Sequence, residues 1–135
     1  MACEFNNDFF LMIYLLNILF YLIAAGCRQK LGMQNSRIPN SYITSSSRFD
    51  NNHGPDRARL HLPRQGSRMG AWSARYNNYY QWIQVDFHRA VEVTQIQTQG
   101  RQDADQWVTR YRVFFSADNV HWAIYKHNSQ PKVIY

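Results

Sequence analysis

The chain has 135 residues, of which 45% are hydrophobic and 18% are charged, with no low-complexity tract or internal repeat. This length suits one domain and excludes two of ordinary size, and the composition is that of a globular protein. All fifteen Lys and Arg residues but only seven of the nine acids follow residue 26, so that part carries a net charge of +8. Such a charge favours sulfated glycans, acidic lipid headgroups or nucleic acid, or it is a basic surface without a dedicated partner.

The N-terminal 26 residues differ from the rest of the chain. Residues 9–25 form an apolar run broken only by Asn17, and small residues end it. This pattern predicts a hydrophobic leader helix over residues 1–26, which is either a secretory signal peptide or an uncleaved N-terminal anchor. Arg28 and Lys30 follow the run, a bias that by itself favours a cytoplasmic downstream part, but the resemblance described below makes a signal peptide the preferred interpretation.

The two cysteines do not form an obvious pair. Cys3 lies in the leader, which leaves Cys27 alone in residues 27–135. A lone cysteine in a secreted protein indicates a partner elsewhere or a reactive thiol. The sequence contains no CxxC, HxxxH or HExxH spacing, so it predicts no metal centre.

Beyond residue 27 the sequence signals strands and almost no helix. Residues 58–62 alternate, with three apolar side chains on one face and Arg59 and His61 on the other. Residues 82–87 alternate as well and are interpreted as a sheet strand, not as the wall of a catalytic site. The acid of this strand, Asp86, is expected to pair with a neighbouring arginine or to cap a turn.

The second half of the chain continues the strand pattern. Val91 and Val93 begin a strand whose apolar phase slips before Ile96, which indicates a bulge. Residues 109–115 predict a long strand, residues 116–119 a hairpin turn, and Trp122 the start of the returning strand. The asparagine of this turn tolerates the left-handed backbone that such hairpins need. Short strands between turn clusters predict a β-sandwich or barrel.

A series of short motifs runs from Cys27 towards the end of the chain. They are, in order, Cys27 with Leu31-Gly32-Met33, then Ile38, Ile43-Thr44-Ser45-Ser46, Ala58-Arg59-Leu60, Trp72, Trp82-Ile83-Gln84-Val85-Asp86-Phe87, Thr98-Gln99-Gly100-Arg101, Trp107-Val108-Thr109, Tyr111, and Ser116-Ala117-Asp118 to Trp122. Together they resemble the discoidin family, the C-terminal-type domain of coagulation factors V and VIII.

This resemblance implies an all-β fold, a distorted jelly-roll β-sandwich of the galactose-binding-domain-like type. It also implies an extracellular, secreted or cell-surface module for cell adhesion that is not an enzyme. Family members bind acidic phospholipid, carbohydrate, collagen or other proteins through loops at one end of the sandwich. The residues expected to be structural are Cys27, Trp72, Trp82, Asp86 and Trp122.

The sequence departs from the family pattern at its end. Family domains continue with further strands and a closing cysteine that pairs with the one at the position of Cys27, whereas this sequence stops at Tyr135. We therefore expect residues 27–135 to be a discoidin-type domain that lacks its C-terminal strands, as a fragment or a truncated gene model. Without that disulfide and those strands, the incomplete sandwich is not expected to fold stably alone.

Two loops are expected to carry the ligand site, because the resemblance places binding loops after the Ser45-Ser46 pair and after the Thr98–Arg101 motif. The candidate ligand-binding residues are Phe49, Asp50, Asn51, Asn52 and His53 in the first loop, and Arg101, Gln102, Asp103, Asp105 and Trp107 in the second. Polar side chains beside an aromatic ring favour a glycan or a protein surface. The alternatives are acidic phospholipid, which the acids of the second loop would repel, and two merely solvated turns.

Several arginines have other expected roles. Arg101 is expected to tie its loop to a carboxylate such as Asp86. Arg59, Arg110 and Arg112 lie opposite apolar stripes, where they form a basic strip for sulfated glycans or a solvated sheet face.

Catalytic sets are missing from the sequence. Glu92 is the single glutamate after the leader, and the run Thr44-Ser45-Ser46-Ser47 lacks the glycines of a nucleophile elbow. The sequence therefore predicts no enzyme and no cofactor. Asp50 and Asp56, with His53, give a weak calcium site. No nucleic-acid partner is expected.

Overall fold

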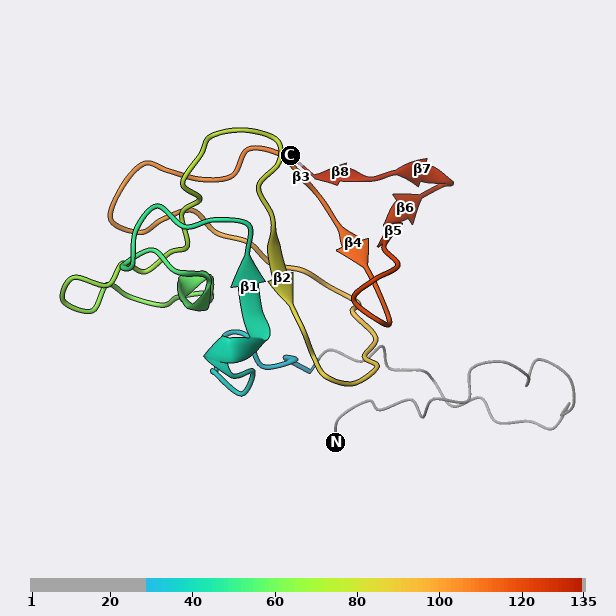
Figure 1. The fold of residues 1–135 in the computed structure, drawn as a ribbon, viewed down its shortest axis with the longest axis horizontal. Coiled ribbons are helices and arrows are strands. Elements are labelled where there is room, and N and C mark those ends of the chain that lie inside the picture. Colours follow the sequence, from blue (N-terminus) through green and yellow to red (C-terminus); the bar gives the residue numbers. More distant parts are fainter. Residues whose placement is uncertain (1–28, 135) are drawn as a thin grey trace, which may run out of the picture. The chain divides into compact units, whose positions relative to one another are not determined.

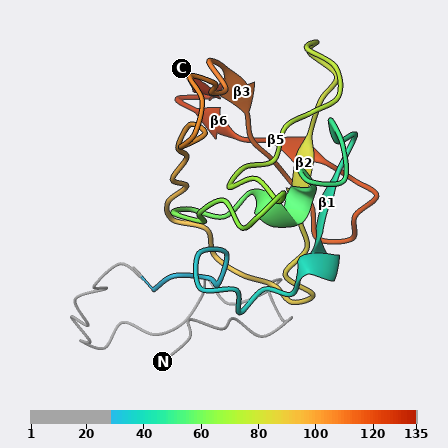
Figure 2. The same ribbon diagram turned by 90° about the vertical axis from the view of Figure 1, so that its left-hand side faces the viewer.

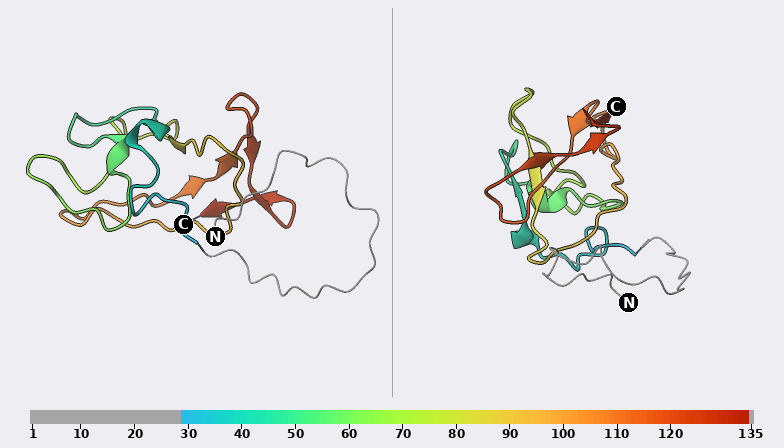
Figure 3. Two further views of the ribbon diagram at one scale, coloured as in Figure 1. Left: turned by 90° about the horizontal axis from the view of Figure 1, so that it is seen from below. Right: turned by 90° about the vertical axis from the view of Figure 1, so that its right-hand side faces the viewer.

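The computed structural model describes residues 29–134, and the predicted leader and Cys27 lie outside this range. The described chain consists of eight short β-strands and two three-residue 3-10 helices joined by loops. Figures 2 and 3 show from three further directions that the described residues form no long helix, and none of their helices has the length and apolarity to cross a membrane. The predicted all-β class is confirmed.

The chain divides into two compact units, which are described separately below. The N-terminal unit comprises the described residues up to Thr98, and the C-terminal unit begins at Gln99.

One antiparallel pair organises the N-terminal unit. Strand β1 (Ile43–Ser45) follows the 3-10 helix η1 (Asn40–Tyr42) and pairs with β2 (Ile83–Val85), with Thr44 opposite Gln84 (Figure 1). Backbone hydrogen bonds from Ser46 to Trp82 and from Asp86 to Tyr42 extend the pairing at both ends. The strand predicted over residues 82–87 is confirmed, although it is shorter. Ile38 and Ile43, 6% and 3% exposed, are the two buried hydrophobic residues of the described chain.

The strand predicted over residues 58–62 is wrong. The chain instead forms the 3-10 helix η2 (Pro55–Arg57), and a turn follows in which His61 has a φ of 58°. The physical reason is that two arginines in this stretch point inwards: Arg57 and Arg59 are 4% and 5% exposed. Their guanidinium groups need carbonyl oxygens from several directions, which a flat ladder of alternating residues does not offer.

The partners of Arg59 come from a distant part of the sequence. Its guanidinium donates to the backbone oxygens of Met33 and Ile38, both at 2.8 Å, and to Asn40 Oδ1 at 2.7 Å. Arg59 therefore does not belong to an exposed basic strip, and that prediction is corrected. It is a clamp inside the N-terminal unit.

The C-terminal unit is built from three chain segments that pair with one another. The first holds β3 (Tyr111–Arg112) and β4 (Phe114–Phe115), the second β5 (Ala123–Ile124) and β6 (Lys126–His127), and the third β7 (Gln130–Pro131) and β8 (Val133–Ile134). The pairs β4–β5, β6–β7 and β3–β8 are all antiparallel, so the segments close a triangle, drawn in orange and red in Figure 1.

The turn between β4 and β5 forms as predicted. Ser116 Oγ accepts from the backbone N–H groups of Asp118 and Asn119, and Asn119 has a φ of 60°. The long strand predicted over residues 109–115 is present only as β3 and β4, interrupted at Val113. No strand is found around Val91 and Val93 within the described range, so that prediction is wrong.

Candidate functional site

The first predicted loop, residues 48–53, is held in a fixed turn by one carboxylate. Asp50 Oδ1 accepts from the backbone N–H groups of Asn52 at 2.7 Å and His53 at 3.1 Å, and it lies 2.7 Å from His53 Nδ1. The hydrogen bond from the His53 side chain is the main cause that lowers the pKa of Asp50. The turn therefore keeps a charged acceptor at its centre.

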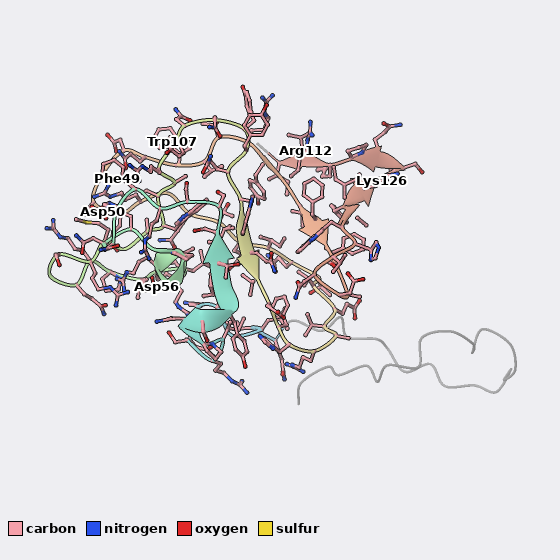
Figure 4. The ribbon with its side chains drawn as sticks, in the orientation of Figure 1. Phe49, Asp50, Asp56, Trp107, Arg112 and Lys126 are labelled. Carbon is pink, nitrogen blue, oxygen red and sulfur yellow. The ribbon has the colours of Figure 1, made fainter. Side chains whose placement is uncertain are left out.

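This turn presents an aromatic ring to solvent. Phe49 is 62% exposed, whereas His53 is only 6% exposed and meets the Phe49 ring edge-on, with the ring centroids 5.4 Å apart. Figure 4 labels Phe49 and Asp50 on this loop. Because His53 is packed beneath the loop, it supports Phe49 and is not itself an open contact for a ligand.

A second loop of the N-terminal unit, residues 75–80, carries three exposed tyrosines. We call it the tyrosine loop: Tyr76, Tyr79 and Tyr80 are 57%, 89% and 84% exposed. The Arg75 guanidinium lies 5.8 Å from the centre of the Tyr76 ring, within the range of a cation–π contact. Sequence reasoning passed over this loop because its aromatic residues stand directly before a strand.

Hydrogen bonds hold the first loop and the tyrosine loop together. The backbone N–H of Phe49 donates to Ser73 O at 2.8 Å, and that of Arg75 donates to Ser47 Oγ at 3.0 Å. The indole N–H of Trp72 donates to Ser47 O at 2.9 Å. Residues 48–53 and 75–80 are thus linked through the residues that flank them, and we call these two loops the aromatic loop pair.

The second predicted loop, residues 101–107, belongs to the C-terminal unit and is closed on itself. The Arg101 backbone N–H donates to Gln106 O at 2.8 Å, and its guanidinium pairs with Asp103 and donates to Gln106 Oε1 at 3.1 Å. Arg101 thus ties the loop to a carboxylate within the loop itself. Trp107 is 64% exposed, and Gln102 and Asp105 are exposed as well.

Gly100 explains why this loop can close so tightly. A Cβ at this position would lie 3.2 Å from both Gln106 O and Trp107 Cβ. Any other residue would therefore press against the end of the loop, so a glycine before Arg101 suits its geometry.

The carboxylates of the weak calcium site are engaged with other groups. Asp50 accepts the three N–H groups of its own turn, and Asp56, on η2 in Figure 4, forms an ion pair with Arg68. Among residues 29–134 no group of three His, Cys, Asp or Glu side chains could hold a metal ion. The geometry gives no support to calcium binding.

The remaining residues named from the sequence lie in turns or on and beside strands. Asp86 Oδ1 accepts from the backbone N–H of His88 at 2.7 Å, and His88 has a φ of 52°, so Asp86 caps a turn. Trp82 and Trp122 are 50% and 45% exposed and lie beside β2 and β5. Arg112 is exposed on β3 (Figure 4).

Comparison with known proteins identifies the family. The sequence profile of the F5/8 type C domain matches residues 42–134. Human coagulation factor VIII is 37% identical over 112 residues, which cover 79% of this chain and 5% of that protein. Lactadherin of Rattus norvegicus is 37% identical over 116 residues, 80% of this chain and 26% of that protein. Human EGF-like repeat and discoidin I-like domain-containing protein 3 is 36% identical over 116 residues, 80% of this chain and 24% of that protein.

These matches fit the observed structure. The matched range holds all eight strands and the three loops named above, and the described residues have the all-β character of the predicted discoidin fold. The chain spans about a quarter or less of the length of these three relatives. It belongs to the F5/8 type C, or discoidin, domain family.

Proposed function

We propose that this chain is an extracellular, non-catalytic binding module whose aromatic loop pair recognises a glycan or a protein surface that carries one. Membership of the discoidin family supports a binding role over a catalytic one. The names of the relatives, among them coagulation factors and lactadherin, support an extracellular setting and offer nothing for a nucleic-acid partner.

One observation carries the proposal, namely four exposed aromatic rings on two loops that hydrogen bonds hold side by side. Sugar rings stack on aromatic faces, and amide and guanidinium groups bond to their hydroxyl groups. Asn51, Asn77 and Asn78 are exposed on the same two loops, as are Arg48 and Arg75. The surface therefore combines apolar faces with donors and acceptors, which suits a polar ligand with an apolar side.

The experiment is a glycan-array screen of the full chain, expressed through the secretory pathway. Tyr79→Ala/Tyr80→Ala is expected to abolish binding to any glycan that the unaltered chain retains, because stacked aromatic anchors dominate such contacts. Tyr125→Ala, which removes a 44% exposed tyrosine of the C-terminal unit, is the matched control and is expected to bind normally. Equal loss in both variants would contradict the proposal.

Acidic phospholipid is the second candidate, favoured by a different observation. The 62% exposed ring of Phe49 stands directly after Arg48, an arrangement in which a ring enters lipid while a cation meets a headgroup. Sedimentation with phosphatidylcholine vesicles, with and without phosphatidylserine, separates the two candidates. Binding that follows the phosphatidylserine content and disappears in Phe49→Ala would favour lipid over glycan.

A further inference from the structure

The serines at residues 45–47 do not form a catalytic motif, but two of their hydroxyl groups hydrogen-bond to a residue beside the tyrosine loop. Ser46 Oγ and Ser47 Oγ both donate to Gln81 Oε1, at 3.0 Å and 2.5 Å. Gln81 follows the tyrosine loop directly, so these bonds join residues that are 34 and 35 positions apart. Ser46 and Ser47 therefore grip the end of that loop from the end of β1.

The same two hydroxyls also accept hydrogen bonds from the loop backbone. Ser47 Oγ accepts from the N–H of Arg75, at the start of the tyrosine loop, at 3.0 Å. Ser46 Oγ accepts from the N–H of Trp82, beyond its end, also at 3.0 Å. The Ser46 hydroxyl also lies 3.4 Å from Trp82 O, a longer second acceptor, whereas the Ser47 hydroxyl donates to Gln81 alone. Both ends of the loop are thus held by neighbouring serines.

The side-chain amide of Gln81 connects the two serines to the middle of the tyrosine loop by a further hydrogen bond. Its Oε1 is filled by the two serine hydroxyls, and its Nε2 donates to Asn78 Oδ1 at 2.8 Å. Asn78 Oδ1 also accepts from the backbone N–H of Tyr80 at 3.0 Å. The chain of bonds from Ser47 through Gln81 to Asn78 therefore ends at the peptide that carries a ligand-facing ring.

We propose that Ser46, Ser47 and Gln81 are positioning residues that hold the tyrosine loop in its binding conformation without touching the ligand. This inference rests on the proposed function for its consequence, although not for its geometry. A loop that is already ordered loses less conformational entropy on binding, so its affinity for a given set of contacts is higher. Truncation of Gln81 or Ser47 leaves all four rings in place and removes only their support.

Amide hydrogen exchange of the full chain, followed residue by residue by NMR, tests the grip without any ligand. In the unaltered chain the amides of Arg75, Tyr80 and Trp82 should be protected. Gln81→Ala should speed exchange at Tyr80 by about tenfold, the effect of losing one hydrogen-bonded support. Ser47→Ala should do the same at Arg75.

Two further variants separate positioning from a general loss of structure. Ser47→Thr keeps the hydroxyl and should restore slow exchange at Arg75. Ser67→Ala removes an exposed hydroxyl in the turn between Gln65 and Arg68 and should change nothing at these amides. Unprotected amides in the unaltered chain, or Ser47→Thr behaving like Ser47→Ala, would overturn the proposal.

Gln81→Glu tests separately the two roles of the Gln81 amide, as acceptor from the serines and as donor to Asn78. A carboxylate still accepts from both serine hydroxyls, but it cannot donate to Asn78 Oδ1. We expect protection to remain at Arg75 and to fall at Tyr80. Loss of protection at both amides, or at neither, would contradict the assigned roles of the two ends of the Gln81 amide.

The binding arm uses immobilised heparin as the probe, since the chain after residue 26 is strongly basic. Gln81→Ala and Ser47→Ala should bind about tenfold more weakly than the unaltered chain, and Ser47→Thr about equally. Unchanged affinity despite faster exchange would overturn positioning, because the loop would then need no support. If the unaltered chain ignores heparin while exchange behaves as expected, the grip stands and sulfated glycan is excluded as the ligand of the proposed function.

Discussion

The buried guanidinium of Arg59 allows a stability prediction to be worked out from the structure. It is 5% exposed, and it donates to Met33 O, Ile38 O and Asn40 Oδ1 at 2.7–2.8 Å. Burial lowers the pKa of Arg59 from its ordinary value. Arg59→Met keeps an unbranched chain of similar length but removes all three donors.

The expected magnitude follows from two opposing effects. Each hydrogen bond from a charged donor contributes about 1.5–3 kcal/mol, so three of them contribute roughly 4–9 kcal/mol. Burying the guanidinium also costs several kcal/mol of desolvation, which the methionine variant does not incur. The net loss in the variant is therefore smaller than the sum of the three hydrogen bonds. We therefore expect Arg59→Met to lower the free energy of unfolding by about 3 kcal/mol. For a chain of this size, that corresponds to a fall in Tm of about 10 °C.

The assay is urea unfolding of the full chain, followed by tryptophan fluorescence. Arg64→Met is the matched control, because Arg64 is exposed and its Nε donates only to the nearby Gly66 O, so its effect should stay within about 0.5 kcal/mol. If both variants unfold at the same urea concentration, the reasoning about Arg59 is refuted. This comparison requires a cooperative transition in the unaltered chain, and such a transition would overturn the sequence-based expectation that residues 27–135 do not fold stably alone.

Three further predictions concern single turns. Gly32→Ala should lower the free energy of unfolding by about 2 kcal/mol or more, because Gly32 has a φ of 120° and an added Cβ would lie 3.0 Å from Arg37 Cβ. Gly66 has a φ of 60° and nothing within 4 Å of an added Cβ, so Gly66→Ala should lower it by only about 1 kcal/mol in the same urea assay. Asn128 has a φ of 50° in the turn between β6 and β7, so Asn128→Val should lower Tm whereas Asn128→Gly should not. The side chain of His121 is the main cause that holds the pKa of Asp118 well below its ordinary 3.8. The ionised carboxylate therefore stabilises its turn fully above pH 3.8, and this stabilisation is lost as the pH falls further, through the lowered pKa. Amide exchange at His121 should quicken in Asp118→Ala at neutral pH, because alanine removes the Oδ1 that accepts this N–H at 2.8 Å, and unchanged exchange would contradict this.

Part of the fold could be predicted because the signals are local. The alternation of residues 82–87 specifies β2 whatever lies opposite, and the serine, aspartate and asparagine of residues 116–119 specify a hairpin turn by their own side-chain bonds. In both places the residues that decide the structure stand within a few positions of one another. Sequence patterns capture such cases well.

The features that the sequence did not predict depend on contacts with residues far away in the chain. Residues 58–62 alternate in polarity, but Arg59 is buried because it is bound by Met33 O and Ile38 O, more than twenty positions away. The sequence also gives no sign that the tyrosine loop lies beside Phe49, because that position depends on the hydrogen bonds that Ser47 Oγ accepts from Arg75 and donates to Gln81. The pattern of polar and apolar residues within a segment carries no information about hydrogen-bond partners so far away in the sequence.

Chemical-shift mapping shows whether a ligand contacts the aromatic loop pair. The full chain, labelled with nitrogen-15, is titrated with a glycan selected on the array, and amide shifts are followed by NMR. We expect the largest changes on residues 48–53 and 75–80, with little change on β3 to β8. Changes confined to the strands of the C-terminal unit, with the aromatic loop pair silent, would contradict it.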